Sequence, residues 1–453
     1  MRLLILLFLS LSIQAYGQLK QLPLKVSDNH RFLVYSDGSP FFYLGDTAWE
    51  LFHRLNHDDA EYYLQKRKEQ GYTVIQAVVL AEIDGLNTPN GQGNKPLIDN
   101  DPTKPNEAYF KDVDWVIQKA AEKGLFIGLL PTWGDKLFKS TWGMGPEIFN
   151  EKNAAIYGEY IGKRYKDQWN IIWILGGDRN PRNESDIAVW NAMAEGVAKG
   201  LGGYDKGLMT YHPQPHQNGG SSTWFHREQW LDFNMHQTGH CYENNRHEKI
   251  TWDYNLTPTK PTLDGEPMYE EHPICFNIKE HGVSNADNVR KLAYWQVFAG
   301  AAGHTYGCHA VWQFYDEGRE PVNAPQHTWK ESLELTGGRQ MGYVRKLMES
   351  RPMLERIPDQ SMVLGENDPM EGYYISANRS SKGTFAFVYT PFGRVLNLNT
   401  TSLKGASLNV SWFNPRTGEM TTAVKMEKQP EMAFMPPSKG EGMDWVLVLD
   451  AVG

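Results

Sequence analysis

The chain has 453 residues and a formal net charge of −9, with 45 Lys and Arg residues against 54 Asp and Glu residues. This length is too great for one small core and favours a large domain followed by a smaller one. The acidic balance, without any basic cluster, argues against nucleic acid or an anionic membrane surface as a partner.

Residues 1–17, MRLLILLFLSLSIQAYG, have the pattern of a signal peptide: Arg2 precedes an apolar stretch, and small residues follow at Ala15 and Gly17. We therefore expect an exported protein, either periplasmic or extracellular. The apolar stretch is well short of the ~20 residues that span a bilayer, so we expect no membrane insertion. No Cys directly follows this segment, and a lipoprotein anchor is not indicated.

The chain contains three cysteines, Cys241, Cys275 and Cys308. Their odd number and the lack of C-x-x-C spacing argue against a disulfide framework and against a zinc knuckle. Whether any two of them form a disulfide stays open at this stage.

Apolar runs alternate with segments that fit helices through most of the chain. Residues 58–70 begin with acids, as helix N-termini do, and residues 109–123 have one apolar face. Such alternation predicts a parallel sheet, and eight units predict an α/β fold of the (β/α)8 TIM-barrel type over residues 18–354. The expected strands lie within residues 41–49, 72–80, 125–134, 171–178, 207–215, 232–240, 261–270 and 304–314.

Residues 355–453 change to short alternating strands with turn residues such as Asn414-Pro415 and Thr417-Gly418 between them. This pattern predicts a small all-β sandwich domain after the barrel, with the boundary near Leu354. It contains no carboxylate-rich or histidine-rich cluster. We therefore expect this domain to pack on the barrel.

The segment NIIWILGGDRNP, Asn170 to Pro181, places an acid directly after a buried strand. Its apolar run suits a strand covered on both faces, which puts Asp178 at the C-terminal end of that strand. In α/β barrels this end carries the chemistry. Asp178 is therefore a candidate catalytic residue, and the alternatives are that it caps the next helix or pairs with Arg179.

Glu266, in the motif LDGEP, is the second candidate acid. Side chains alternate along a strand, so Asp264 and Glu266 point the same way, with Glu266 nearer the tip. Asp178 ends the fourth expected strand and Glu266 ends the seventh, which places them across the barrel mouth from one another. Two carboxyl groups facing over a pocket are the minimum equipment for cleaving a glycosidic bond.

The motifs GDTAW, WILGGDRNP, DGEP, WFNPRTGE and DWVLVL, in this order, resemble glycoside hydrolase family 140 over essentially the whole mature chain. Members of that family are described as exported apiosidases of Bacteroidota that act on side chains of the pectin rhamnogalacturonan II. The resemblance implies a retaining mechanism with Asp178 as acid/base and Glu266 as nucleophile. Most of the wider clan has a Glu after an Asn at the first position, whereas here Asp178 follows two glycines, a departure that the family shares.

Other polar residues at strand ends are candidates for substrate binding. Asp46 ends the first expected strand, and its alternative role is to cap the following helix. His212, His236 and His240 are candidate hydrogen-bond donors to substrate or to Glu266, and a structural role is about as plausible for each. We interpret three further acids, Glu270, Glu271 and Glu280, as solvated loop charges.

Aromatic residues are abundant, with 15 Trp and 22 Tyr. Flat aromatic rings pack against the C–H faces of sugars, so some are expected to line a binding surface while most belong to the core. The candidate platforms for a sugar ring are Trp49, Trp133, Trp142 and Trp312.

Two other classes of function compete with a glycosidase of this kind. A metal-dependent barrel hydrolase would use residues such as His212, His216 and His236, but the motif GDTAW lacks the paired His ligands that this class has at its first strand. A non-catalytic glycan-binding protein would keep the aromatic mouth without needing two carboxyl groups. We therefore expect a glycosidase with an oligosaccharide or polysaccharide substrate and no metal or cofactor. Cleavage of a plant-glycan linkage other than that of apiose is the alternative, and the oligomeric state stays open.

Overall fold

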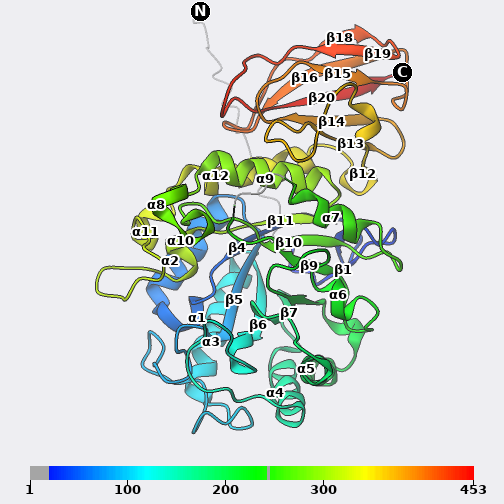
Figure 1. The fold of residues 1–453 in the computed structure, drawn as a ribbon. Helices are drawn as coiled ribbons and strands as arrows, with labels where there is room; N and C mark the ends of the chain where they lie inside the picture. Colours follow the sequence, from blue (N-terminus) through cyan, green and yellow to red (C-terminus); the bar gives the residue numbers. More distant parts are fainter. Residues whose placement is uncertain (1–19, 242–244) are drawn as a thin grey trace, which may run out of the picture.

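A computed structural model describes residues 20–241 and 245–453 of the chain (Figure 1). The predicted signal peptide, residues 1–17, lies outside the described residues. A larger α/β part is followed by a β-rich part, which lies over α9 (Ala286–Phe298) and α12 (Thr336–Glu349) in Figure 1.

Eight parallel strands form the centre of the α/β part; seven lie within apolar runs that the sequence predicted, and the last begins one residue before its run, at Gly303. Six of them form one curled sheet in the order β11-β4-β5-β6-β7-β8, and β9 pairs with β10. β9 also lies beside β8, and β10 lies beside β11. The strands are β4 (Tyr43–Thr47), β5 (Val74–Leu80), β6 (Phe126–Thr132), β7 (Ile171–Gly176), β8 (Met209–His212), β9 (Asn234–Gln237), β10 (Thr262–Glu266) and β11 (Gly303–Tyr306).

The backbone pairing confirms only part of the expected fold. Within the described part of the chain, the named sheets do not join all eight strands into one continuous ladder. The closed (β/α)8 barrel predicted from the sequence is therefore represented by a six-stranded curled sheet and a separate parallel pair. The strand register also shifts between Asp264 and Glu266 in β10, where a bulge interrupts regular pairing.

Helices cover the outside of the parallel strands. The two helices predicted from the sequence are present, at His57–Glu69 (α2) and Glu107–Glu122 (α3), and the side chains of Asn56 and Asn106 cap their N-termini. The other helices are α1 (Leu51–Arg54), α4 (Glu151–Tyr165), α5 (Glu184–Leu201), α6 (Ser222–Phe225), α7 (His247–Tyr254), α8 (Ile278–His281), α10 (His309–Trp312) and α11 (Trp329–Ser332).

Antiparallel strands make up both ends of the described chain. A small N-terminal sheet contains β1 (Leu24–Val26), β2 (Leu33–Tyr35) and β3 (Pro40–Phe41). The C-terminal part has a larger sheet with β12 (Arg356–Pro358), β13 (Ser376–Ser380), β14 (Phe385–Thr390), β16 (Ser407–Asn414), β17 (Glu419–Met420), β18 (Val424–Glu427) and β20 (Trp445–Val452). A second sheet pairs β15 (Leu396–Asn399) with β19 (Glu431–Phe434). Apolar residues from both sheets share one core, as the sequence pattern predicted.

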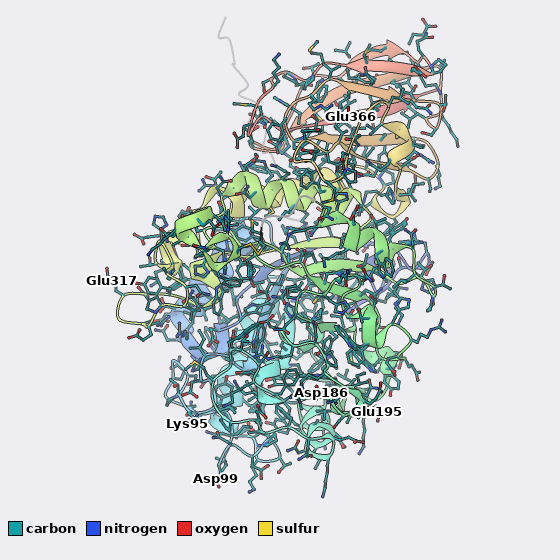
Figure 2. The ribbon with its side chains drawn as sticks, viewed as in Figure 1. Lys95, Asp99, Asp186, Glu195, Glu317 and Glu366 are labelled. Atoms are coloured by element: carbon teal, nitrogen blue, oxygen red, sulfur yellow. A yellow bond between two sulfur atoms is a disulfide. The ribbon has the colours of Figure 1, made fainter. Side chains whose placement is uncertain are left out.

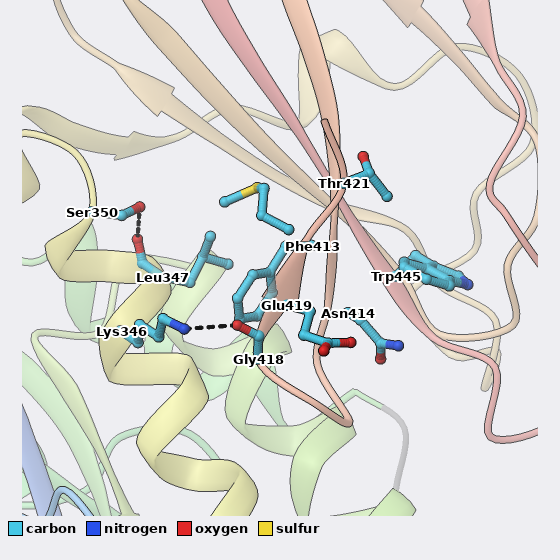
Figure 3. A pocket seen from close by; sticks show the side chains of 10 residues that line it. Lys346, Leu347, Ser350, Phe413, Asn414, Gly418, Glu419, Thr421 and Trp445 are labelled. Carbon is cyan, nitrogen blue, oxygen red and sulfur yellow. Dashed lines mark hydrogen bonds between the residues drawn. The ribbon is translucent and has the colours of Figure 1, made fainter. Parts of the chain in front are cut away.

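A buried ion pair joins the two parts of the molecule. Arg290 of α9 donates from Nε to Oδ2 of Asp444 over 2.7 Å and from Nη2 to Oδ1 over 3.0 Å. Tyr389 of β14 also donates to Asp444. Nearby, Lys346 of α12 donates to the carbonyl oxygen of Gly418 over 2.9 Å (Figure 3). The β-rich part is thus fixed to the α/β part by directional contacts as well as by apolar packing.

We predict that Asp444→Ala lowers the free energy of unfolding by about 3 kcal/mol, because it removes the buried partner of Arg290 and leaves only the partly exposed Asp287 beside its charge. The matched control is Asp450→Ala, which breaks a more exposed pair with Arg351 across the same seam. That variant should lose at most about 1 kcal/mol. Urea unfolding of both variants gives the measurement, and equal losses would contradict the importance of burial at Asp444.

Candidate active site

Asp178 follows β7 on a segment whose backbone only glycine-rich sequences readily adopt. Gly176 and Gly177 have φ angles of 84° and 108°, and Asp178 itself has a φ of 53°. A Cβ atom on Gly176 would lie 2.5 Å from the carbonyl oxygen of His212, and one on Gly177 would lie 2.7 Å from the ring of Trp133. The two glycines therefore permit both the left-handed turn and its close packing. Such strain is typical of functional sites.

The carboxyl group of Asp178 has two neighbours from its own side of the site. Trp142 donates from its indole nitrogen to Oδ2 of Asp178 over 3.0 Å. The buried guanidinium of Arg179 lies 3.7 Å from the same oxygen, while it donates hydrogen bonds to the backbone carbonyls of Asp178, Trp142 and Phe138. Arg179 thus holds the loop that carries Trp142 against the catalytic candidate.

The structure decides between the alternatives for Asp178. Asn183, not Asp178, caps the next helix, α5, by accepting a hydrogen bond from the backbone of Asp186. The predicted contact with Arg179 is present but long, and most of the Arg179 donors bind carbonyl oxygens. Asp178 is therefore left with its carboxyl group in the cavity described below.

Glu266 ends β10 and contacts two histidines. Nε2 of His240 lies 3.1 Å from Oε1, and Nε2 of His212 lies 3.1 Å from Oε2. The second contact has ion-pair distance without hydrogen-bond geometry. The backbone N–H of Asp178 donates to Nδ1 of His212 over 3.2 Å, so in the neutral ring the proton lies on Nε2 and faces Glu266. His212 therefore connects the two acids physically.

The two acids have pKa values shifted in opposite directions. Burial, and then the negative charge of Glu266, raise the pKa of Asp178 well above its usual range. Burial would also raise the pKa of Glu266, but the contacts with His212 and His240 outweigh it and lower this pKa to about 2. At neutral pH the arrangement favours a protonated Asp178 beside an ionised Glu266.

A cavity of about 530 Å³ lies at the C-terminal ends of the parallel strands and contains both acids. Five candidates from the sequence line it together with them: Trp49, Trp133, Trp142, His240 and Trp312. Residues that the sequence analysis did not single out also line it, among them Glu82, Gln237, Tyr269, His272 and Phe276. Aromatic walls with a few acids, histidines and amides among them have the composition of a sugar-binding pocket.

Two substrate-binding candidates lie elsewhere. Asp46 is fully buried, and its Oδ2 accepts a hydrogen bond from Nε of Arg67 over 2.6 Å, so the structure gives it a structural ion pair in place of the predicted contact with substrate. His212 is also fully buried behind Glu266 and is not among the lining residues. It acts on the site by positioning Glu266.

Several other interpretations need correction. Glu270 is not a solvated loop charge: it is buried and accepts hydrogen bonds from the backbone of Gly337 and Gly338 and from Tyr306. Glu271 is partly buried and contacts His327, whereas Glu280 is exposed. His236 lies away from the cavity and pairs with Asp253 over 2.7 Å.

The histidines do not converge on one point. In the part of the chain that the structure describes, no group of three or more His, Cys, Asp or Glu side chains has an arrangement that could hold a metal ion. His212 faces Glu266 and His236 faces Asp253, so the geometry offers no support for the competing metal-dependent hydrolase.

A disulfide joins Cys241 and Cys275, and Cys308 is a buried free thiol. The sequence argued against a disulfide framework, and one such bond is nevertheless present because the loops after β9 and β10 meet in space. The backbone N–H of Cys275 also donates to the carbonyl oxygen of His240 over 3.0 Å. The disulfide therefore lies directly beside a residue that contacts Glu266.

Two acids whose pKa values are shifted in opposite directions lie in an aromatic cavity at the ends of parallel strands. This arrangement is typical of the catalytic domain of a glycoside hydrolase. Residues 27–355 match the family model described as "Apiosidase-like, catalytic domain", and the chain belongs to this family. Residues 357–450 match the model described as "Putative collagen-binding domain of a collagenase". No curated protein matches the chain in sequence.

Two solved structures are similar to nearly the whole chain. One, named "Glycoside hydrolase", is 33% identical with a TM-score of 0.85, and the match covers 95% of this chain and 97% of that one. The other is a glycoside hydrolase family 5 protein from Bacteroides vulgatus, 32% identical with a TM-score of 0.85, with 95% of this chain and 93% of that chain covered. As for the membrane, none of the helices in the described ranges has the length and apolar character needed to cross one.

We predict that Asp178→Asn and Glu266→Gln change stability at neutral pH in opposite directions. The pKa of Asp178 is raised on folding, so this acid makes the fold less stable as pH rises above its ordinary pKa of 3.8. The Asn variant should therefore melt at a higher temperature than wild type at pH 7. This difference should disappear below about pH 3.8. The pKa of Glu266 is lowered from 4.5, so its charge stabilises the fold above that value, and the Gln variant should melt at a lower temperature at pH 7. Thermal melts from pH 3 to pH 8 test this, and shifts of the same sign at pH 7 would contradict the assignment.

Proposed function

We propose that this protein is a retaining glycoside hydrolase with Asp178 as the acid/base and Glu266 as the nucleophile. The observation that carries the proposal is the pair of acids in one cavity, one favoured in its protonated form and the other in its ionised form. Membership of a family of apiosidase-like catalytic domains supports it. A glycan-binding protein without catalysis would not need this opposed pair.

In the first step, Asp178 gives its proton to the glycosidic oxygen while a carboxylate oxygen of Glu266 attacks the anomeric carbon. The bond to the leaving sugar breaks, and a covalent glycosyl ester forms on Glu266. In the second step, ionised Asp178 takes a proton from water, the water oxygen attacks the same carbon, and Glu266 leaves as a carboxylate. Two inversions give net retention. His212 and His240 hold Glu266 ionised at the start of the cycle.

For the substrate, we propose an apiose-containing linkage in side chains of the pectin rhamnogalacturonan II. The resemblance to glycoside hydrolase family 140 and the family model matched by residues 27–355 support this choice. Another plant-glycan linkage is the alternative within the same chemistry. Export by the segment at residues 1–17 would bring the enzyme to such polymers.

We further propose that residues 18–354 function as one eight-stranded barrel and that residues 355–453 form a separate domain. The contacts of β9 with β8 and of β10 with β11 bring the parallel pair next to both edges of the six-stranded sheet. The site residues support the barrel as the working unit, since they follow strands of both sheets: Trp49 follows β4, Asp178 follows β7 and Glu266 ends β10.

Asp178→Asn and Glu266→Gln should each lower kcat by at least about 100-fold, because each removes one half of the proton-transfer and attack machinery. The alkaline limb of the wild-type pH profile should follow the raised pKa of Asp178, since only its protonated form can act as the acid. Asp205→Asn, at an exposed acid, is the matched control and should keep wild-type activity. Activity close to wild type in either site variant would overturn the role of that residue.

The stereochemistry and the substrate have a test of their own. Incubation with rhamnogalacturonan II side-chain oligosaccharides that carry apiose at the cleaved bond should release apiose-terminated fragments, and NMR of the first product should show the anomeric configuration of the substrate. An inverted first product would refute the retaining mechanism. Intact apiose linkages together with cleavage of another pectic or hemicellulosic bond would refute the substrate alone.

A further inference from the structure

A third carboxyl group, that of Glu82, lines the cavity together with Asp178 and Glu266. Glu82 lies two residues after β5, at the same C-terminal strand ends as the other two acids. Its side chain is partly exposed, and among the described residues no hydrogen bond or ion pair to its carboxyl group is present. The two-step reaction proposed above gives this acid no role.

The backbone around Glu82 is firmly held. The N–H of Ile83 donates to Oε1 of the buried Glu50 over 3.0 Å, and the other carboxylate oxygen of Glu50 lies 2.6 Å from Nδ1 of His53. The N–H of Asp84 donates to the carbonyl oxygen of Glu82 over 2.7 Å. Glu82 is thus presented to the cavity from a braced turn, as the positioning of a ligand requires.

The charges around Glu82 are mostly negative. Burial, followed by the charges of Asp178, Asp135 and Glu50, raises the pKa of Glu82 well above its usual range, and Arg179 acts weakly in the opposite direction. No Lys or Arg side chain is among the described residues that line the cavity. A ligand that adds a further negative charge here meets repulsion, whereas a neutral hydroxyl group can satisfy the unpartnered carboxyl oxygens.

We propose that Glu82 is a specificity-determining residue that binds two neighbouring hydroxyl groups of a neutral sugar in the cavity. The inference rests on the proposed glycosidase function and extends it from the reacting bond to the kind of sugar that lies beside Asp178. In the protonated form that the raised pKa favours, the carboxyl group donates from one oxygen and accepts at the other, which matches a pair of adjacent hydroxyl groups.

The kinetic test uses Glu82→Ala and Glu82→Gln on the cleaved oligosaccharide. Glu82→Ala should lower kcat/KM by about tenfold to 100-fold, the range for two lost hydrogen bonds, with most of the change in KM and the melting temperature unaltered. Glu317→Gln is the matched control, because this acid lies on an exposed outer loop (Figure 2) and is not among the residues that line the cavity. A kcat/KM within twofold of wild type in both Glu82 variants would overturn the inference.

A binding test separates this inference from the proposed function. In the Asp178→Asn background, titration calorimetry with D-apiose, D-xylose and D-galacturonate as probes should show that adding Glu82→Ala weakens binding of the neutral sugars. If wild type cleaves no glycoside while Glu82 variants lose neutral-sugar binding, the proposed function fails and the role of Glu82 stands. If the Asp178→Asn protein binds no neutral sugar, or binds galacturonate better, the role of Glu82 fails even where hydrolysis is intact.

Discussion

The hydrogen bond from the backbone N–H of Asp178 to Nδ1 of His212 connects the two halves of the site. It places one acid on a left-handed turn and, through the far nitrogen of the imidazole, sets the proton that faces Glu266. The turn exists because Gly176 and Gly177 tolerate contacts that any side chain would block. The backbone turn that follows β7 thus acts, through His212, on the carboxylate of Glu266 at the end of β10.

The fold stabilises several acids away from water, and it does so in different ways. Asp46 has a guanidinium from Arg67, Glu270 has two backbone amides from the start of α12, and Asp135 has the ammonium of Lys136. Glu82 has none of these partners. The contrast separates acids that hold the structure together from those whose polar atoms remain for a ligand.

Strand positions and the two principal acids could be predicted from the sequence because unbroken apolar runs are typical of strands buried on both faces, and the C-terminal ends of parallel strands meet at one edge. The same reasoning misplaced Asp46, since a strand covered on both faces gives no sign of which side each residue faces. Glu82 follows an apolar strand as Asp178 does, so its signal was present. The burial of Glu270 was not predictable, because its partners are 67 and 68 residues away.

Closure into one eight-stranded ladder also lay beyond the sequence pattern. Apolar periodicity predicts which residues form strands, but it does not predict the register between them, which shifts between Asp264 and Glu266 where β10 pairs with β9.

The disulfide between Cys241 and Cys275 makes the structure of these loops depend on the redox conditions around the protein. Disulfides persist in oxidising compartments and are rare in a reducing cytosol. Protein made and kept in a reducing cytosol would hold the loops after β9 and β10 together near His240 only through non-covalent contacts such as the Cys275 amide bond. Formation of this bond is an oxidation, and it joins the two loops covalently beside His240, which contacts Glu266.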